Sequence, residues 1–285
     1  MADAFRREEL ATGDNPAPAD ARGLLQWAGA LAEAAAAEDV YRSKEGRKTL
    51  RFLREGRSYF LKLHRGVGGG EIFKNLLQAR LPVLSARNEY RAVAALTAIG
   101  VDTMTVAAYA ERGNNPASRQ SMIVTDDLVG TVSLEDYCAD WARLPPKPST
   151  RLRLVRKLAD SAGRMHRAGI NHRDFYICHF HLDEQSLGDD VLRCHLIDLH
   201  RAEIRRRVPR RWQEKDLAGL YFSAMDCGLT RRDLLRFMSR YSGGGLRQAL
   251  GTDRFLWRAV ERKAVQLSRR EHGREPPITA SRSPG

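Results

Sequence analysis

The sequence contains little cysteine, and the few cysteines that it has are scattered. There are four among 285 residues, at Cys138, Cys178, Cys194 and Cys227, and none of them forms a C-x-x-C pair. A disulfide framework or a zinc knuckle needs clustered cysteines, so the sequence argues against both. We expect reduced and mostly buried thiols.

Long apolar runs are also absent. No stretch reaches the roughly 18 apolar residues of a membrane-spanning helix, and the opening Met-Ala-Asp is not followed by the apolar core of a signal peptide. We therefore expect a cytoplasmic protein. Hydrophobic residues make up 42% of the chain and charged residues 29%, which is ordinary for a soluble globular protein of one large domain or two lobes.

Acidic residues are outnumbered by basic ones. The chain has 35 Asp and Glu against 48 Lys and Arg, a formal net charge of +13. Such an excess indicates an anionic partner, which could be nucleic acid, a membrane surface or a polyanionic substrate. A base-stacking surface of interleaved aromatic residues is lacking, which favours a partner other than nucleic acid.

The two ends of the chain show little patterning. Residues 1–39 are polar around Pro16 and Pro18 and then rich in alanine, which predicts an N-terminal arm that runs into a short helix. Residues 269–285 are rich in Arg, Pro and Ser, which predicts a flexible basic tail.

Short alternating segments follow the arm. They predict an antiparallel meander of strands at 40–42, 49–53 and 58–63, with a turn at 55–56. Ser85 can cap a helix that runs to Ile99. Strands near 104–109 and 121–124 complete a small sheet, and the polar segment 125–128 is typical of a linker.

The second half of the chain is predicted to be mainly helical. A long helix follows the proline-rich segment 145–148 and ends near Gly169, because apolar residues recur there at spacings of three and four. Further helices are predicted at 216–225 and 230–241, the latter with Thr230 and Asp233 at the spacing of a capping box.

Two aspartates carry the clearest chemical signal. The motif His172-Arg173-Asp174 directly follows the long helix, and Asp198 comes 24 residues after Asp174. Phosphoryl transfer from ATP needs a carboxylate at the acceptor hydroxyl, a second carboxylate on Mg²⁺ and a lysine on the nucleotide. Asp174, Asp198 and Lys62 occur in that order. A capping role for Asp198 and a salt bridge from Asp174 to Arg173 are the structural alternatives.

This pattern predicts a protein-kinase-like bilobal fold of the α+β class. Residues 40–128 would form a small antiparallel-sheet N-lobe, and residues 129–268 a mainly helical C-lobe with the catalytic loop. In the N-lobe, Lys62 lies late in the third strand and Glu89 is the candidate to pair with it. A strand lysine is often only solvated, and Glu71 competes with Glu89.

Three further residues are weaker candidates. Gly46 lies in the first hairpin, where backbone amides could cover the phosphates, although no G-x-G-x-x-G string is present and a single glycine often serves only the turn. Asp127, in the polar linker, is a candidate nucleotide contact. His179 stands where protein kinases place a magnesium-binding asparagine, and since Mg²⁺ prefers oxygen it could instead have a structural or substrate role.

Longer strings make the chain resemble a known family. HRDFYICHF at 172–180, IDLHRA at 197–202, KDLAGLYFS at 215–223, YFLKLHRG at 59–66 and SLEDYCADW at 133–141 are similar to lipopolysaccharide core heptose(I) kinases. The resemblance covers roughly residues 40–265. It implies transfer of the γ-phosphoryl group of ATP to the 4-hydroxyl of the first inner-core heptose. Asp174 would be the base, Lys62 the nucleotide-binding lysine and Asp198 the magnesium ligand.

Arginines dominate the segment after Asp198. Five of them are candidates to bind an acceptor that bears carboxylates and phosphates, or form a solvated basic face: Arg205, Arg206, Arg207, Arg210 and Arg211. Asp216 is expected to start a helix and to hold the catalytic loop through backbone hydrogen bonds. Residues 71–81 could dock on the inner membrane or pack in the core.

Other partners and functions stay open at this stage. The resemblance implies acyl carrier protein as a possible partner and the cytoplasmic face of the inner membrane as the place of action. Phosphorylation of Kdo or of protein Ser, Thr or Tyr is an alternative, although A-P-E and glycine-rich signatures are missing. A basic binding protein that only retains the fold is a third possibility, which the ordered catalytic set disfavours.

Overall fold

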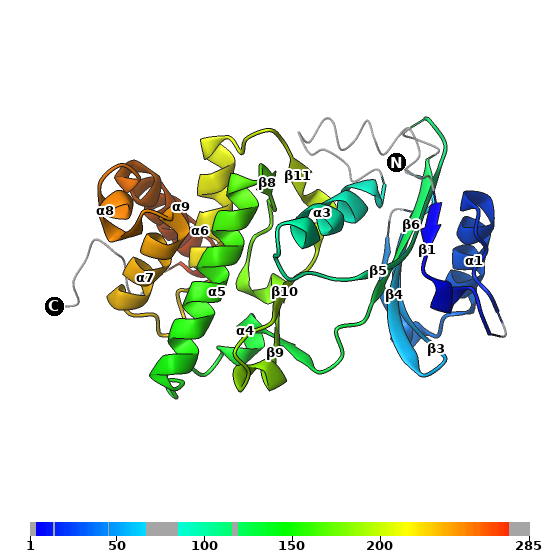
Figure 1. Ribbon diagram of the computed structural model, residues 1–285, viewed down its shortest axis with the longest axis horizontal. Helices are drawn as coiled ribbons and strands as arrows, with labels where there is room; N and C mark the ends of the chain where they lie inside the picture. Colours follow the sequence, from blue (N-terminus) through cyan, green and yellow to red (C-terminus); the bar gives the residue numbers. More distant parts are fainter. Residues whose placement is uncertain (1–3, 14, 45, 67–84, 116–118, 274–285) are drawn as a thin grey trace. The chain divides into compact units, whose positions relative to one another are not determined.

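The structure, a computed structural model, describes residues 4–13, 15–44, 46–66, 85–115 and 119–273. Contacts divide the chain into two compact units. Unit 1 comprises Met1–Ala94 with Met104–Val129, and unit 2 comprises Ala95–Thr103 with Gly130–Gly285. The predicted class, an antiparallel-sheet part followed by a mainly helical part, is confirmed (Figure 1).

Unit 1 is built on one antiparallel sheet of six strands in the order β1-β5-β6-β4-β3-β2. The strands are β1 (Ala4–Arg6), β2 (Val40–Lys44), β3 (Arg47–Arg54), β4 (Arg57–His64), β5 (Val106–Arg112) and β6 (Gln120–Asp126). The predicted meander of β2, β3 and β4 is confirmed by its register, in which Thr49 faces Lys62. The turn between β3 and β4 has positive φ at Glu55 and Gly56, as a tight two-residue hairpin requires.

The predicted short helix in the N-terminal arm is present, but the prediction that the arm before it is loose was wrong. After β1, which pairs with β5, comes a 3₁₀ turn at Glu8–Leu10, and α1 then runs through Ala21–Ala34. Asp20 caps α1 by accepting from the Gly23 amide at 3.0 Å. Leu24 and Trp27 are buried against the sheet. The apolar spacing within 21–34 was masked by the neighbouring prolines and alanines.

Helix α3 (Arg87–Ala98) follows Ser85, whose hydroxyl accepts from the Arg87 amide at 3.0 Å as the capping prediction requires. Tyr90 of α3 stacks on Tyr109 of β5, with ring centroids 4.2 Å apart. The sheet face that receives Tyr90 is opposite to the face that α1 covers (Figure 1). The segment 71–81, for which a membrane contact was considered, lies outside the described residues.

Unit 2 is mainly helical. Its helices, besides the end of α3, are α4 (Leu134–Tyr137), α5 (Pro148–Arg167), α6 (Arg210–Ala224), α7 (Arg231–Ser242), α8 (Gly245–Leu250) and α9 (Arg254–His272). Val155, Ala162 and Met165 of the α5 stripe are buried, while Leu152 and Leu158 are partly buried. Helix α7 begins with the predicted capping box of Thr230 and Asp233. In this unit α5 packs against α7 and α6 against α9.

Two predicted boundaries in unit 2 were wrong. Helix α6 begins six residues before Asp216, because Pro209 ends the preceding loop and the arginines after it are good helix formers. Helix α9 extends to His272, so residues 269–272 are helical rather than part of a flexible tail. Among the described helices none is long and apolar enough to cross a membrane.

Short strands position the loops of unit 2. One small sheet has the order β10-β9-β7, with β7 (Thr131–Ser133), β9 (Phe180–Asp183) and β10 (Cys194–Leu196). A second pairs β8 (Ile170–Asn171) with β11 (Glu203–Ile204). The H-R-D motif follows β8, and Asp198 follows β10, so both aspartates lie at strand ends.

Candidate active site

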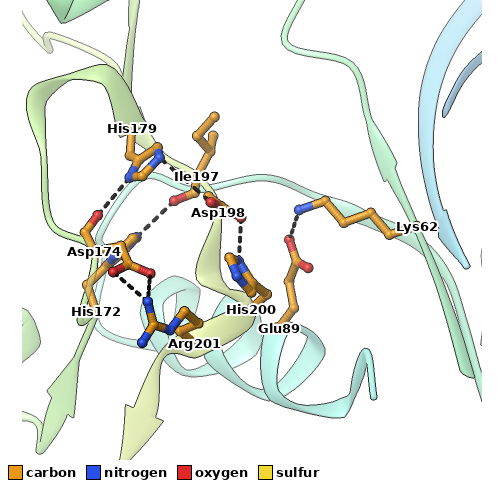
Figure 2. Close-up of polar contacts among 9 residues, drawn as sticks. All are labelled: Lys62, Glu89, His172, Asp174, His179, Ile197, Asp198, His200 and Arg201. Atoms are coloured by element: carbon orange, nitrogen blue, oxygen red, sulfur yellow. Dashed lines mark hydrogen bonds and ion pairs between the residues drawn. The ribbon is translucent and has the colours of Figure 1, made fainter. Parts of the chain in front are cut away.

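Lys62 and Glu89 form an ion pair within unit 1, as predicted. The Lys62 Nζ lies 2.7 Å from the Glu89 Oε1 (Figure 2). Lys62 alternates along β4 with Leu61 and Leu63, which belong to the core under α1, so its side chain lies on the opposite face. Glu89 is 1% exposed and Lys62 24% exposed, so the lysine keeps access to a ligand while its partner is buried.

A double-mutant cycle tests the coupling in this pair. Lys62→Met, Glu89→Gln and the double variant should give a coupling free energy of about 1–3 kcal/mol in chemical unfolding, because Glu89 is withdrawn from water. Arg65 and Glu33 form an exposed pair in the same unit and serve as the control. Their coupling should stay below about 1 kcal/mol. Equal coupling in the two pairs would contradict the assignment.

Gly46 and Asp127 have structural partners of their own. Gly46 has φ +70°, its carbonyl accepts from the Arg65 amide at 2.8 Å, and a Cβ there would come within 2.5 Å of a backbone oxygen. The turn alone therefore explains the glycine. The Asp127 carboxylate accepts from the Ser58 hydroxyl at 2.7 Å. A nucleotide contact at Gly46 or Asp127 stays a prediction.

Asp216 holds the backbone of the H-R-D motif. It is fully buried in the middle of α6, and its two oxygens accept from the His172 amide at 2.7 Å and the Arg173 amide at 2.8 Å. The predicted loop-holding role is thus confirmed, although Asp216 does not start the helix. Arg173 has φ +77°, a conformation that a non-glycine residue adopts only under such constraint.

Loss of the Asp216 carboxylate should destabilise unit 2. Asp216→Ala leaves two buried amides without an acceptor, so we expect the free energy of unfolding to fall by about 2–5 kcal/mol in urea denaturation. Asp216→Asn keeps one acceptor oxygen and should lose clearly less. A loss below about 1 kcal/mol for the alanine variant would show that another group holds the loop.

The imidazole of His172 links the two aspartate-bearing segments. Its Nε2 donates to the Ile197 carbonyl at 2.9 Å, and Ile197 directly precedes Asp198. Burial lowers the pKa of His172, so the ring is neutral and fixed in one tautomer. The H-R-D histidine therefore has a structural role: it holds the segment of Asp198 next to the segment of Asp174 within unit 2.

Asp174 is oriented by an arginine that the sequence analysis did not assign. The Arg201 Nη1 lies 3.0 Å from each carboxylate oxygen of Asp174 (Figure 2). This contact fixes the plane of the carboxylate. Arg201 could have been nominated from the sequence, because it follows Asp198 by three residues and lies in the family string IDLHRA at 197–202. Only folding brings it to Asp174.

Asp198 lies between two histidines. It has φ +59°, and its Oδ1 is 2.6 Å from the His200 Nδ1, while its Oδ2 is 3.6 Å from the His179 Nε2 (Figure 2). The His179 Nδ1 donates to the Asp174 carbonyl at 2.7 Å, so this ring contacts both aspartate-bearing segments. Burial lowers the pKa of His179, but its hydrogen bonds to Cys178 and Asp174 outweigh burial and raise the pKa to about 9.

The donor set suits Mg²⁺ bound together with phosphate. Asp198 is one carboxylate with a 34% exposed side chain, and in the described part of the chain no three His, Cys, Asp or Glu residues cluster as a metal cage. Mg²⁺ is usually held by one or two carboxylates plus phosphates and water. Asp198 fits that role, whereas a ligand role for His179 stays a prediction.

The five candidate arginines differ in their surroundings. Arg205 is already engaged, because it pairs with Glu203 at 2.6 Å and donates to the Asn171 side chain at 2.6 Å. Arg210 pairs with Glu214 one turn along α6. The side chains of Arg206, Arg207 and Arg211 are exposed. Acceptor binding by the five stays a prediction.

Fold and site together define a phosphotransferase of the kinase-like class, with a lysine–glutamate pair in an antiparallel-sheet unit and two aspartates in a helical unit. The family model for the lipopolysaccharide kinase (Kdo/WaaP) family matches residues 32–241. This chain belongs to that family.

Curated relatives and a solved structure agree with the family. Over 234 residues the chain is 53% identical to lipopolysaccharide core heptose(I) kinase WaaP of Pseudomonas aeruginosa, covering 81% of this chain and 87% of the relative. It is 50% identical over 233 residues to the WaaP of Escherichia coli, covering 81% and 88%. The solved structure of WaaP in complex with acyl carrier protein aligns with a TM-score of 0.71 and 46% identity, covering 84% of this chain and 91% of that one.

Proposed function

We propose that this protein is a lipopolysaccharide core heptose(I) kinase, which transfers the γ-phosphoryl group of ATP to the 4-hydroxyl of the first inner-core heptose. The observation that carries this proposal is identity of 50% or more over four-fifths of the chain to enzymes of that name. The residues of the site support it, because each side chain that phosphoryl transfer needs is present with an orienting partner.

Asp174 is the proposed base. As the heptose oxygen bonds to the γ-phosphorus and the bond to ADP breaks, the Asp174 carboxylate takes the hydroxyl proton. Arg201 holds that carboxylate in one plane, and Asp216 holds the backbone that carries it. These contacts preassemble the base, so little reorganisation remains for the reaction itself.

Lys62 and Asp198 are the proposed ligand-binding side chains. Lys62, held by Glu89, binds the phosphates of ATP, and Asp198, held by His200, binds the Mg²⁺ that accompanies them. The metal ion would neutralise charge on the phosphates. We further propose that residues 40–128 serve as the nucleotide lobe and residues 129–268 as the catalytic lobe.

A transfer assay tests the proposal. Wild-type protein with Mg²⁺ and γ-labelled ATP is given lipopolysaccharide that lacks its heptose phosphates, and the labelled product is hydrolysed to locate the phosphate. Label on the 4-position of heptose I would support the proposal. Label on Kdo, or transfer only to a protein, would show that the acceptor is Kdo or a protein instead of the heptose. No transfer by folded protein would contradict the kinase assignment.

Two partners extend the proposal. Because a relative of 46% identity was solved with acyl carrier protein, we propose that this chain also binds an acyl carrier protein. The net charge of +13 supports peripheral attachment to the anionic cytoplasmic face of the inner membrane. Co-purification tests the acyl carrier protein. Sedimentation with vesicles, at low and at high salt, tests the membrane attachment.

A further inference from the structure

Trp212, near the start of α6, is surrounded by positive side chains of unit 2. Four cationic groups lie close to its ring centroid: Arg173 at 4.9 Å, Arg211 at 5.4 Å, Lys215 at 5.6 Å and Arg205 at 6.0 Å. Arg173 comes from the H-R-D motif and Arg205 follows β11. We call these five residues the Trp212 cluster.

The Trp212 cluster has more positive than negative charge. Glu203 pairs with Arg205 at 2.6 Å and with Arg173 at 3.5 Å. Arg211 and Lys215, by contrast, form no ion pair with any residue in the part of the chain that the structure describes. The Glu203 carboxylate therefore pairs with two of the four cations, and the other two, Arg211 and Lys215, remain for a ligand.

Lys215 is partly buried, with its Nζ 5.6 Å from the centroid of the Trp212 ring. Its pKa is lowered, chiefly because it is half-buried, and Asp174 raises that pKa in part while Arg201 and Arg173 lower it further. An ammonium group that is partly withdrawn from water and lies among arginines gains from an added anion. The carboxylates of Asp174 and Asp216 both raise the pKa of this ammonium group, so it is not without negative charge in its surroundings.

Trp212 explains how like charges stay assembled. A cation over an indole ring is attracted by the negative face of the ring, which offsets part of the repulsion between neighbouring cations. The exposed Arg206 and Arg207 have no such contact with the ring. The Trp212 ring therefore positions the cluster's cations before a ligand binds, whereas Arg206 and Arg207 only add positive charge to the surface.

We propose that the Trp212 cluster binds one anionic group, a carboxylate or a phosphate, of the acceptor oligosaccharide beside its accepting heptose. Arg211 and Lys215 contact that group, and Trp212 is a positioning residue. The inference rests on the proposed function and deepens it, because it assigns acceptor recognition to a defined group of side chains. It also makes a negative charge near the heptose a requirement for efficient transfer.

Steady-state kinetics with separate variation of the two substrates test the inference. For Lys215→Met and Trp212→Leu we expect the acceptor KM to rise about tenfold to a hundredfold, as for loss of a charge-assisted hydrogen bond, with the ATP KM within twofold. Lys215→Arg and Trp212→Phe keep the charge and the ring, and should recover most of the loss. A rise in the ATP KM instead, or no rise in either, would overturn the inference.

A matched control separates site binding from net charge. Arg258 is an exposed arginine of α9 outside the cluster, and Arg258→Gln removes one charge as Lys215→Met does. The control should keep the wild-type acceptor KM. An equal loss in the control would show a general charge effect and overturn the assignment to the cluster. Melting temperatures of all variants are measured to establish that they are folded.

Modified acceptors identify the anion. The acceptor is used intact, with its carboxylates methyl-esterified, and with its phosphates removed. The modification that removes the recognised anion should raise the acceptor KM of the wild type and have little further effect on the acceptor KM of Lys215→Met. If each of the two modifications raised the KM of Lys215→Met by the same factor as that of the wild type, the inference would be overturned.

Calorimetric binding of the acceptor without ATP keeps this result separate from the proposed function. If wild type transfers no phosphate, the kinase proposal fails by itself. Tighter binding of the acceptor by wild type than by Lys215→Met would then still support the Trp212 cluster as an acceptor site, and equal binding would overturn it.

Discussion

Asp174→Asn is expected to lower the kcat of phosphate transfer to the heptose by a factor of about 10²–10⁴. The amide has nearly the shape of the carboxylate and can still accept from Arg201 through its oxygen, so substrate binding should change little. What it loses is the capacity to take the hydroxyl proton. The measurement is transfer of γ-labelled phosphate at saturating ATP, Mg²⁺ and acceptor.

The control for this variant is Asp140→Asn, which makes the same chemical change at an aspartate of unit 2 whose side chain is 69% exposed. It should retain wild-type kcat. If Asp174→Asn retained more than about a tenth of the wild-type kcat while folded, Asp174 would not be the base, and the carboxylate would have only a structural role with Arg201.

Asp198→Asn is expected to shift the Mg²⁺ dependence of the reaction. The amide lacks the charge that a hard divalent cation prefers, so the half-saturating Mg²⁺ concentration should rise by more than about 100-fold, and activity at millimolar Mg²⁺ should fall accordingly. The experiment is a titration of transfer rate against Mg²⁺ at constant free ATP. Partial recovery by Mn²⁺ would further support direct ligation.

His200→Gln provides the graded comparison. His200 donates to Asp198 at 2.6 Å and orients it without contacting the metal in this proposal. Removal of such an outer partner typically costs about 10–100-fold in metal affinity. The shift for His200→Gln should therefore be smaller than for Asp198→Asn. An unchanged Mg²⁺ dependence in Asp198→Asn would refute the ligand role.

The residues predicted from sequence were those whose chemistry is carried by local context. Lys62 lies in a strand of alternating apolar residues, and Asp174 follows a long amphipathic helix, so order along the chain was enough to nominate both. The meander and the capping box of α7 followed from period and spacing for the same reason. The ion pair of Lys62 with Glu89 could be anticipated because Glu89 lies in the first turn of the next described helix.

The misplaced elements show where local context was insufficient. The arm was predicted as loose because its prolines and alanines hide the stripe of Leu24 and Trp27, which becomes meaningful only against a sheet. The helix predicted from Asp216 begins six residues earlier, at Arg210, because its start depends on Pro209. Charge pattern alone does not distinguish an exposed loop from the first turn of a helix.

The sequence by itself determined the class of this protein, the order of its main predicted strands and helices, and the aspartates and lysine of its candidate site, because these depend on residue type, spacing and long family strings. Tertiary structure alone decided which side chains orient them. Arg201 reaches Asp174, Asp216 reaches the H-R-D amides, and Arg173 joins Trp212 only after distant segments fold together. Such contacts depend on direction and distance in space, which the spacing of residues along the chain does not encode.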